Sequence, residues 1–330
     1  MITVGVDAGT YSYRIVALED DVVFFREIPT EVVRRNPDEI IGILEELQPD
    51  AIAGPSAYGL PVKRFSELSN EDVALMTLNF GESLMGLRRL IDLLRRSELA
   101  EMTWTIPGIS QLPTIPKHRR ANRIDLGTSD KLCSVALAMK EFRLKDFILV
   151  EAGFGFNAFV GVKDGKVVDA MGGTTGFPSF SSMGALDGEL AYLMGNIPKS
   201  ALFMGGVSSL LRDMGIDARF NSLPEFAIRW LSEFLLKGIR MMEVSVGKCD
   251  VVVSGRFFDL YYDEFLEFSG LKALRLHGRS SAEGGAVLAN GIVGGRYEWI
   301  VESLRVREAE APLSNLTSDV RSLLSLPFSP

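Results

Sequence analysis

A gapless internal repeat is the feature of this sequence that most restricts its fold. The motif V-D-A-G near the start recurs as V-E-A-G, so that Asp7 aligns with Glu151 and Gly9 with Gly153. Both copies continue as an apolar strand, an acidic turn and a third strand. A single glycine turn between two strands is ordinary hairpin chemistry. Two copies at one spacing predict duplicated domains whose hairpins face one another across a cleft.

The two turns carry the residue types of an anion site beside a cation. Backbone N–H groups and hydroxyls in such turns bind anions, and glycine lets the backbone approach a phosphate closely. A carboxylate next to an anion fits when a divalent cation lies between them, so we expect Asp7 and Glu151 to hold Mg²⁺, directly or through water. A simple turn cap at Asp7 is the alternative. The expected phosphate-binding residues are Gly9, Thr10, Tyr11, Ser12, Gly153, Phe154, Gly155 and Asn157.

Other classes of function find little support in the sequence. It contains neither a P-loop motif nor a complete dinucleotide-binding fingerprint. The net charge of −8 argues against a nucleic-acid partner. No run of about 18 apolar residues suggests a membrane partner, and the two cysteines, Cys133 and Cys249, are too far apart to indicate a disulfide framework. We therefore expect a cytoplasmic protein with a small-molecule partner, and a homodimer stays open.

The paired turns, together with a late strand ending in glycine, resemble the superfamily of acetate and sugar kinases, actin and heat-shock chaperone ATPases. There the turns are phosphate loops one and two, and the late strand carries an adenosine motif. The resemblance implies an α/β fold of two duplicated ribonuclease H-like, actin-like ATPase domains, residues 1–144 and 145–330, with a nucleotide cleft between them. It implies ATP and Mg²⁺ as cofactors, and adenosine binding by Ser254, Gly255, Arg256, Gly284 and Gly285.

Within the superfamily, the stretch from Gly9 to Arg14 matches the carboxylate-kinase pattern G-[ST]-x-S-x-[KR]. The connection after the second hairpin is similar to that of butyrate kinases, and the whole chain resembles an archaeal family labelled predicted butyrate kinases. Acetate and butyrate kinases have Asn in place of Asp7 and His in place of Glu151. The resemblance implies a Mg-ATP-dependent kinase for a small acceptor, preferably a short carboxylic acid such as butyrate. A sugar or polyol kinase and a non-catalytic ATP-binding switch or activator ATPase are the alternatives.

Residues 105–131 combine prolines with a basic cluster, which predicts a loop that binds the acceptor. Arg119, Arg120 or Arg123 would neutralise the substrate carboxylate or the transferred phosphoryl group. For any single arginine a solvated loop residue is the alternative, whereas the cluster as a whole favours a site. Asp125 would orient a hydroxyl acceptor, serve as its base or contact metal. With Asp7 these form the predicted catalytic set. Thr128 or Ser129 is expected to cap the helix that follows, while for Asp130 and Lys131 a site role and a structural role are equally open.

The remaining pattern is architectural. Helical periodicity covers 36–47, 84–97 and most of 222–247. Trp230, Met241 and Met242 are expected in the core. The tail from Ala309 is expected to pack loosely or lie on the surface.

Overall fold

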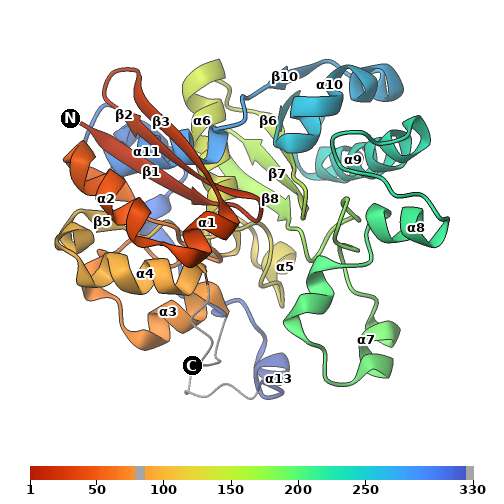
Figure 1. The fold of residues 1–330 in the computed structure, drawn as a ribbon, viewed down its shortest axis with the longest axis horizontal. Helices are drawn as coiled ribbons and strands as arrows, with labels where there is room; N and C mark the ends of the chain where they lie inside the picture. Colours follow the sequence, from red (N-terminus) through yellow and green to blue (C-terminus); the bar gives the residue numbers. More distant parts are fainter. Residues whose placement is uncertain (79–85, 325–330) are drawn as a thin grey trace.

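Two five-stranded mixed sheets form the two halves of the molecule (Figure 1). The computed structural model describes residues 1–78 and 86–324. The first sheet has the strand order β3-β2-β1-β4-β5 and the second β8-β7-β6-β9-β10. The strands are β1 (Thr3–Ala8), β2 (Ser12–Leu18), β3 (Val22–Pro29), β4 (Ala51–Ala53), β5 (Thr103–Trp104), β6 (Phe147–Ala152), β7 (Asn157–Lys163), β8 (Lys166–Met171), β9 (Asp250–Ser254) and β10 (Ala273–Arg275).

The two sheets have the same topology. In each, the first strand pairs antiparallel with the second and parallel with the fourth. The hairpin registers also agree: Ala8 pairs with Tyr13, and Ala152 pairs with Asn157, which are equivalent pairs when Asp7 is aligned with Glu151. The repeat in the sequence is therefore a repeat of strand pairing.

The helices and short 3₁₀ segments surround and separate the sheets. The helices are α1 (Thr30–Arg35), α2 (Asp38–Leu47), α3 (Asn70–Thr77), α4 (Leu87–Arg96), α5 (Lys117–Arg120), α6 (Ser129–Phe142), α7 (Gly188–Met194), α8 (Val207–Asp213), α9 (Glu225–Val246), α10 (Arg256–Ser269), α11 (Ser280–Ile292), α12 (Glu298–Ser303) and α13 (Ser318–Arg321). The 3₁₀ segments are η1 (Phe65–Glu67), η2 (Glu98–Glu101), η3 (Ile109–Gln111), η4 (Lys199–Phe203) and η5 (Val306–Glu308). Among the described residues, no helix has the length and apolar character needed to cross a membrane.

Strand β6 shows how the core is divided. Its side chains alternate between two faces because successive residues of a strand point in opposite directions. Phe147 and Leu149 pack toward α6 and α11, whereas Ile148 and Val150 pack toward α9 and α10. All four are almost completely buried, so this sheet is covered on both faces.

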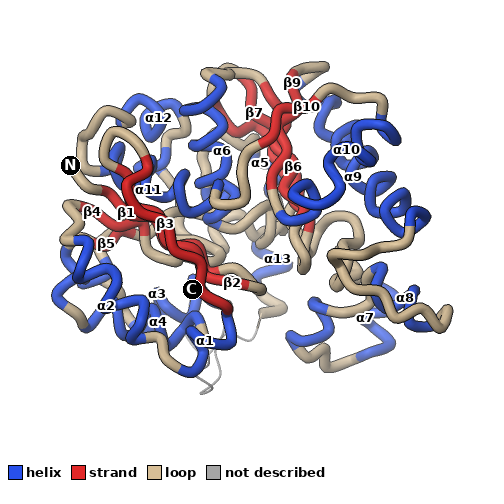
Figure 2. Tube along the Cα trace, turned by 45° about the horizontal axis from the view of Figure 1, so that its top comes forward, coloured by secondary structure: helices blue, strands red, loops and turns tan. Residues whose placement is uncertain are grey.

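Helices α6 and α11 pack together between the two sheets (Figure 2). Although α11 comes late in the sequence, it lies on β1, β2 and β4 of the first sheet. The backbones of the two helices come close at one point: a Cβ atom on Gly284 would lie 1.8 Å from the carbonyl oxygen of Cys133. Glycine at this position therefore serves the contact between the helices.

The helices expected from periodicity are present as α2, α4 and α9. The first residues of the range 84–97 lie outside the described residues. Met242 is buried and Trp230 packs against the core, but Met241 is 49% exposed, because it lies on the solvent side of α9. The tail is also more ordered than expected: Leu313 and Leu316 are buried, and Asn315 donates hydrogen bonds to the backbone of the basic loop. Pro327 and Pro330 lie outside the described residues.

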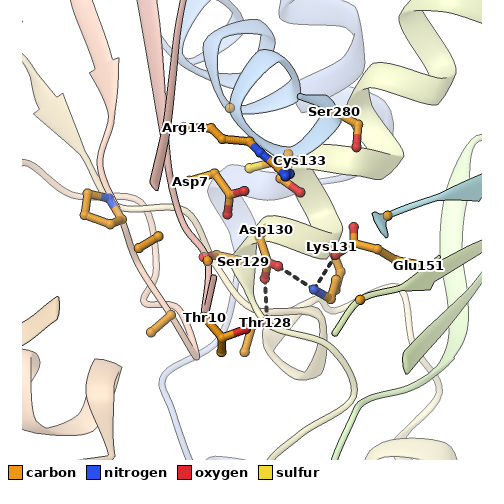
Figure 3. A pocket seen from close by; sticks show the side chains of 18 of the residues that line it. Asp7, Thr10, Arg14, Thr128, Ser129, Asp130, Lys131, Cys133, Glu151 and Ser280 are labelled. Atoms are coloured by element: carbon orange, nitrogen blue, oxygen red, sulfur yellow. Dashed lines mark hydrogen bonds and ion pairs between the residues drawn. The ribbon is translucent and has the colours of Figure 1, made fainter. Parts of the chain in front are cut away.

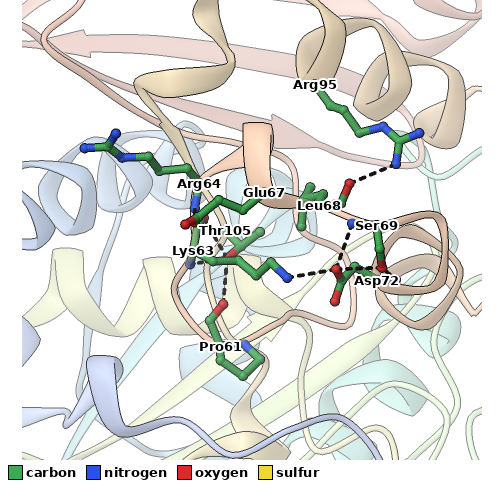
Figure 4. A network of polar contacts seen from close by, with 9 residues as sticks. All are labelled: Pro61, Lys63, Arg64, Glu67, Leu68, Ser69, Asp72, Arg95 and Thr105. Atoms are coloured by element: carbon green, nitrogen blue, oxygen red, sulfur yellow. Dashed lines mark hydrogen bonds and ion pairs between the residues drawn. The ribbon is translucent and has the colours of Figure 1, made fainter.

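A polar network fixes the long connection between β4 and α3 (Figure 4). The Thr105 hydroxyl donates to the Pro61 carbonyl at 2.8 Å and accepts from the Lys63 N–H at 3.0 Å. Lys63 reaches Asp72 at 2.8 Å, and the Ser69 hydroxyl caps α3 by accepting from the Asp72 N–H. This connection includes residues 54–58, which line a cavity between the two halves.

Candidate functional site

A cavity of about 330 Å³ opens between the two halves. Both repeated turns, the end of β9 and the first turn of α6 line it. Of the residues predicted to bind nucleotide or metal, the cavity is lined by Asp7, Gly9, Thr10, Tyr11, Ser12, Glu151, Gly153, Phe154, Gly155, Ser254, Gly255, Arg256 and Gly285. Most of the predicted nucleotide site is thus brought together in one place.

The two turns are closed in the same way. The Gly9 N–H donates to the Ser12 carbonyl at 3.1 Å, and the Gly153 N–H donates to the Phe156 carbonyl at 2.9 Å. The Thr30 hydroxyl donates to the Gly9 carbonyl at 2.9 Å and so holds the first turn on α1. The two halves therefore present equivalent tight turns to a shared space.

Asp7 lies at the end of β1 and points into the cavity (Figure 3). Its carboxylate makes no hydrogen bond or ion pair with the described residues. Burial, together with the nearby Asp130 carboxylate, raises the pKa of Asp7 to about 7. A bound cation would stabilise the ionised form of a carboxylate in such an environment.

Glu151, the equivalent residue at the end of β6, is already engaged. It accepts from Lys131 Nζ at 2.5 Å and from Ser134 Oγ at 2.8 Å. Lys131 also forms an ion pair with Asp130, which in turn accepts from the Thr128 hydroxyl (Figure 3). The pair Asp130 and Lys131, whose role the sequence left open, is therefore part of the cavity wall.

The residues present fit a divalent cation only with help from a ligand. Among the described residues, no three His, Cys, Asp or Glu side chains converge in a way that could hold a metal ion. Mg²⁺ commonly binds through one or two carboxylates while phosphate oxygens and water supply the other ligands. Asp7, free of protein partners and facing the cavity, fits that arrangement.

At the predicted adenosine end, the Ser254 and Ser280 hydroxyls are 2.6 Å apart. Gly255 has a φ of +99°, and a Cβ there would lie 2.5 Å from the Ala152 carbonyl oxygen, so its glycine is required by the β6 backbone. Arg256 lies over the Tyr11 ring, 4.1 Å from the centroid. Gly284 does not line the cavity because it faces α6.

A second cavity of about 380 Å³ adjoins the first and shares Arg14, Arg256 and Gly278 with it. Glu27 projects into it from β3, where the Ser12 hydroxyl donates to it at 2.5 Å and Arg14 at 3.2 Å. The hydroxyl predicted to bind phosphate is therefore held by Glu27 in this structure.

The basic cluster of the predicted acceptor loop, residues 117–123, lies outside both cavities. Arg119 donates to the Val168 carbonyl at 2.9 Å. Arg120 is buried and ion-paired to Glu310 at 2.6 Å, while Arg123 is exposed. Arg119 is thus held by β8, whereas the C-terminal tail folds back onto the cluster, with Glu310 paired to Arg120 and Asn315 donating to backbone carbonyls.

Asp125 is also held by structural partners. Its carboxylate accepts from the N–H and hydroxyl of Thr174, both at 2.8 Å, and from the Gly127 N–H at 3.1 Å. Asn157, a predicted phosphate ligand, donates to the Pro178 carbonyl at 2.8 Å and does not line the cavity. Asp125 therefore holds the loop that contains Thr174, and Asn157 holds the loop that contains Pro178.

Several cavity residues were not singled out from the sequence. Tyr58, Leu87, Ile106, Phe156, Phe203 and Ser280 line it. The G-T-S-D-K stretch at the start of α6 also lines the cavity, and it did carry a signal, because polar residues at a helix start can cap the helix or bind a ligand. The apolar residues come from loops and helix ends far apart in the sequence.

The fold and site define an α/β protein with two matching halves and paired glycine-containing turns that line the cavity between them. The chain belongs to the family described as "Protein of unknown function (DUF1464)", whose model matches residues 5–317. No curated protein sequence matches it.

The chain is similar to several solved structures. Acetate kinase from Entamoeba histolytica is 14% identical, with a TM-score of 0.53, and the match covers 82% of this chain and 85% of that one. ROK hexokinase from Thermus thermophilus is 12% identical, with a TM-score of 0.47 and coverage of 87% and 97%. The activator of 2-hydroxyisocaproyl-CoA dehydratase from Clostridium difficile, with bound ADPNP, is 11% identical, with a TM-score of 0.43 and coverage of 92% and 97%. The likeness to acetate kinase shows a shared fold and confirms the predicted α/β class.

Proposed function

We propose that this protein is a Mg-ATP-dependent phosphotransferase that acts on a small acceptor. The observation that supports this most is the convergence of both equivalent turns and Asp7 on one cavity. Backbone N–H groups from the two halves would bind the phosphates from both sides. Asp7 would hold the Mg²⁺ of the nucleotide, which when bound neutralises charge on the phosphate oxygens.

The nucleotide base and ribose would extend past Gly255 and Arg256 toward the second cavity. That cavity contains the apolar side chains of Phe25 and Leu260 beside charged groups, a mixture suited to a flat heteroaromatic ring. Glu27 would release the Ser12 hydroxyl when phosphate enters, so that the hydroxyl can donate to the ligand.

For the acceptor we propose a short carboxylic acid, with butyrate as the first compound to test. The apolar side chains of Leu87, Ile106 and Phe203 line the same cavity as the ammonium group of Lys131. An alkyl chain would pack against the former, and a carboxylate would be attracted to the latter. A carboxylate acceptor is already ionised and therefore requires no base.

A sugar or polyol kinase is the second candidate, and Asp130 favours it. This carboxylate lines the cavity at the start of α6, where it could accept the proton of an attacking hydroxyl. Burial alone would raise the pKa of Asp130, but the Lys131 ammonium and the Thr128 hydroxyl lower it below its usual value. Asp130 would then stay ionised at neutral pH.

The test is to measure ADP release from Mg-ATP with a panel of short carboxylic acids, sugars and polyols. We expect acceptor-dependent turnover with at least one short acid, and its loss in Asp7→Ala. Turnover with sugars alone would establish the second candidate. Calorimetric binding of Mg-ATP with no turnover on any acceptor would instead indicate an ATP-binding switch, and absence of binding would overturn the proposal.

A further inference from the structure

The 3₁₀ segment η4 reaches from the C-terminal half to the N-terminal half. Its first residue, Lys199, donates from Nζ to the carbonyl oxygens of Thr77 and Leu78, both at 2.9 Å. These carbonyls lie at the C-terminal end of α3, where the last carbonyl groups lack partners within the helix and a lysine can satisfy them. The same ammonium group lies over the Tyr58 ring, 5.7 Å from its centroid. Lys199 therefore joins the two halves, and we call these three contacts the η4 clasp.

The η4 clasp lies beside the first cavity. Tyr58 lines this cavity from the N-terminal half, and Phe203, the last residue of η4, lines it from the C-terminal half. The Phe203 ring packs edge-on against the Phe156 ring, with 5.2 Å between the centroids and 69° between the planes. Phe156 closes the second glycine turn through its carbonyl group. Phe203 is 44% exposed, so part of its ring is available to a ligand.

The segment that contains η4 is held mainly at its ends. No residue of α7 is buried, and in η4 only Ala201 is. Helix α7 lies at the edge of the molecule, away from both sheets (Figures 1 and 2). Near the end of η4, the Ser182 hydroxyl donates to the Leu202 carbonyl at 2.7 Å. The C-terminal end of η4 is thus fixed to the second half, whereas Lys199 holds its N-terminal end on the first half.

Phe203 lines the first cavity but not the second, toward which the base and ribose would extend. Leu87 and Ile106 line the same first cavity from the N-terminal half. An alkyl chain between these walls would gain hydrophobic stabilisation with each methylene group until its end met the Phe203 ring. We propose that Phe203 limits the length of the acceptor, and that Lys199 is the positioning residue that keeps this ring in the cavity wall. This inference rests on the proposed function, because it assigns the size of the acid that the same site takes.

Loss of the ring should allow longer acids to react. The quantity to measure is the length ratio, which is kcat/KM for octanoate divided by kcat/KM for butyrate. In Phe203→Ala the wall recedes by the volume of a phenyl ring. We expect this variant to raise the length ratio at least about tenfold over the wild type, because one methylene group in an apolar pocket already changes kcat/KM about tenfold or more.

Loss of the clasp should act in the same direction. Lys199→Met keeps the length of the side chain but removes its charge and its hydrogen bonds, so the N-terminal end of η4 is released. We expect the length ratio to rise at least about threefold. Lys199→Arg can still donate to the carbonyl groups of α3 and should restore the wild-type ratio.

A double variant distinguishes a positioning role from a general structural role. If Lys199 acts through Phe203, its charge has no effect on the length ratio once the ring is gone. Phe203→Ala combined with Lys199→Met should therefore match Phe203→Ala alone within about twofold. A merely structural effect of Lys199→Met would lower kcat/KM for both acids alike and leave the length ratio unchanged.

Matched controls come from exposed residues that line neither cavity. Phe268 on α10 is 40% exposed, and Phe268→Ala should keep the wild-type length ratio. Lys237 on α9 lies over the Phe234 ring, 5.6 Å from the centroid. Lys237→Met thus removes a comparable contact between a lysine and a ring and should also leave the length ratio unchanged.

Hydrogen exchange tests the clasp without substrate or turnover. In the nucleotide-free protein, the amide groups of residues 199–205 should exchange at least about fivefold faster in Lys199→Met than in the wild type. Exchange in α9 should stay the same. Unchanged exchange in residues 199–205 overturns the clasp.

The kinetic outcomes separate this inference from the proposed function. Turnover of butyrate by Phe203→Ala with no gain for octanoate overturns the limit set by Phe203 and leaves the proposed function in place. No turnover of any acid by the wild type or by Phe203→Ala removes the acid as acceptor and this limit with it, whereas the exchange result still decides the clasp. Shifts of the two single variants that add in the double variant overturn the positioning role of Lys199.

Discussion

Arg256 lies over the aromatic ring of Tyr11, with 4.1 Å between the guanidinium carbon and the ring centroid. Tyr11 belongs to the first turn of the N-terminal half, and Arg256 begins α10 in the C-terminal half. This contact therefore joins the two halves beside the cavity that both residues line.

We expect Tyr11→Ala to weaken Mg-ATP binding about two- to fivefold, because an exposed cation–π contact contributes about 0.5–1 kcal/mol. Tyr11→Phe keeps the ring and should bind as the wild type does. Isothermal titration calorimetry on both variants checks this. Equal losses in the two would assign the effect to the hydroxyl group and contradict the role of the ring.

Asp7→Asn should make the fold more stable at alkaline pH. The pKa of Asp7 is raised from 3.8 to about 7 in the folded protein. The folded state therefore holds its proton more tightly, and stability falls as pH rises from about 4 to about 7. Asn has no charge to bury, so the variant should gain roughly 1–4 kcal/mol over the wild type above pH 7, at about 1.4 kcal/mol per pKa unit.

Denaturant unfolding in EDTA at pH 4.5 and pH 8 measures this difference. Asp213→Asn removes a charge from the exposed end of α8 and serves as the control. A stability difference between Asp7→Asn and the wild type that does not change with pH would contradict the expected burial of charge.

Gly255→Ala should destabilise the fold, not merely the adenosine site. The substitution forces a Cβ to within 2.5 Å of the Ala152 carbonyl oxygen, at a φ of +99°. We expect a loss of roughly 2–5 kcal/mol. Gly270→Ala, at a φ of +64° with open space around it, should lose only about 1–2 kcal/mol. Equal losses in thermal melts would show that the contact with Ala152 is unimportant.

A comparison of Asp125→Asn with Asp130→Asn should distinguish a structural role of the first carboxylate from a catalytic role of the second. Asp125 accepts three hydrogen bonds outside the cavity, so its change should lower stability by about 1–3 kcal/mol and leave kcat near the wild-type value. Asp130→Asn should lower kcat by about 10² to 10⁴ if the acceptor is a hydroxyl, and much less if it is a carboxylate. Steady-state kinetics and unfolding curves of both variants measure these effects. A large kcat loss confined to Asp125→Asn would indicate that the acceptor binds at the loop that contains Asp125.

The sequence predicted the strand pairing well because a hairpin is a local pattern. The turn residues Gly9 and Gly153 and the alternating apolar residues around them lie within one short segment each. The predicted phosphate-binding residues that line the cavity followed from the same segments. The repeat also gave a second indication of the same structure, since a chance turn would not recur with the same spacing between its flanking strands.

The local sequence does not predict which arginines of the basic cluster face a ligand. Nothing local distinguishes Arg120, buried against Glu310, from an arginine that faces a ligand, because its partner lies in the tail. The same holds for Gly284, whose glycine is explained only by the approach of α6. Contacts between distant segments decide these cases, and a single sequence does not display them.

The position of α11 affects how the protein folds during its synthesis. The N-terminal sheet leaves the ribosome early, but the helix that covers one of its faces ends at Ile292, close to the end of the chain. Until that helix has been synthesised, the sheet face that carries Gly5, Leu18, Ala51 and Ala53 lacks this cover, and an uncovered sheet face is prone to associate with other nascent chains. Final folding of the first half therefore waits for the second half, and an N-terminal fragment cut at residue 144 would lack the helix that completes it.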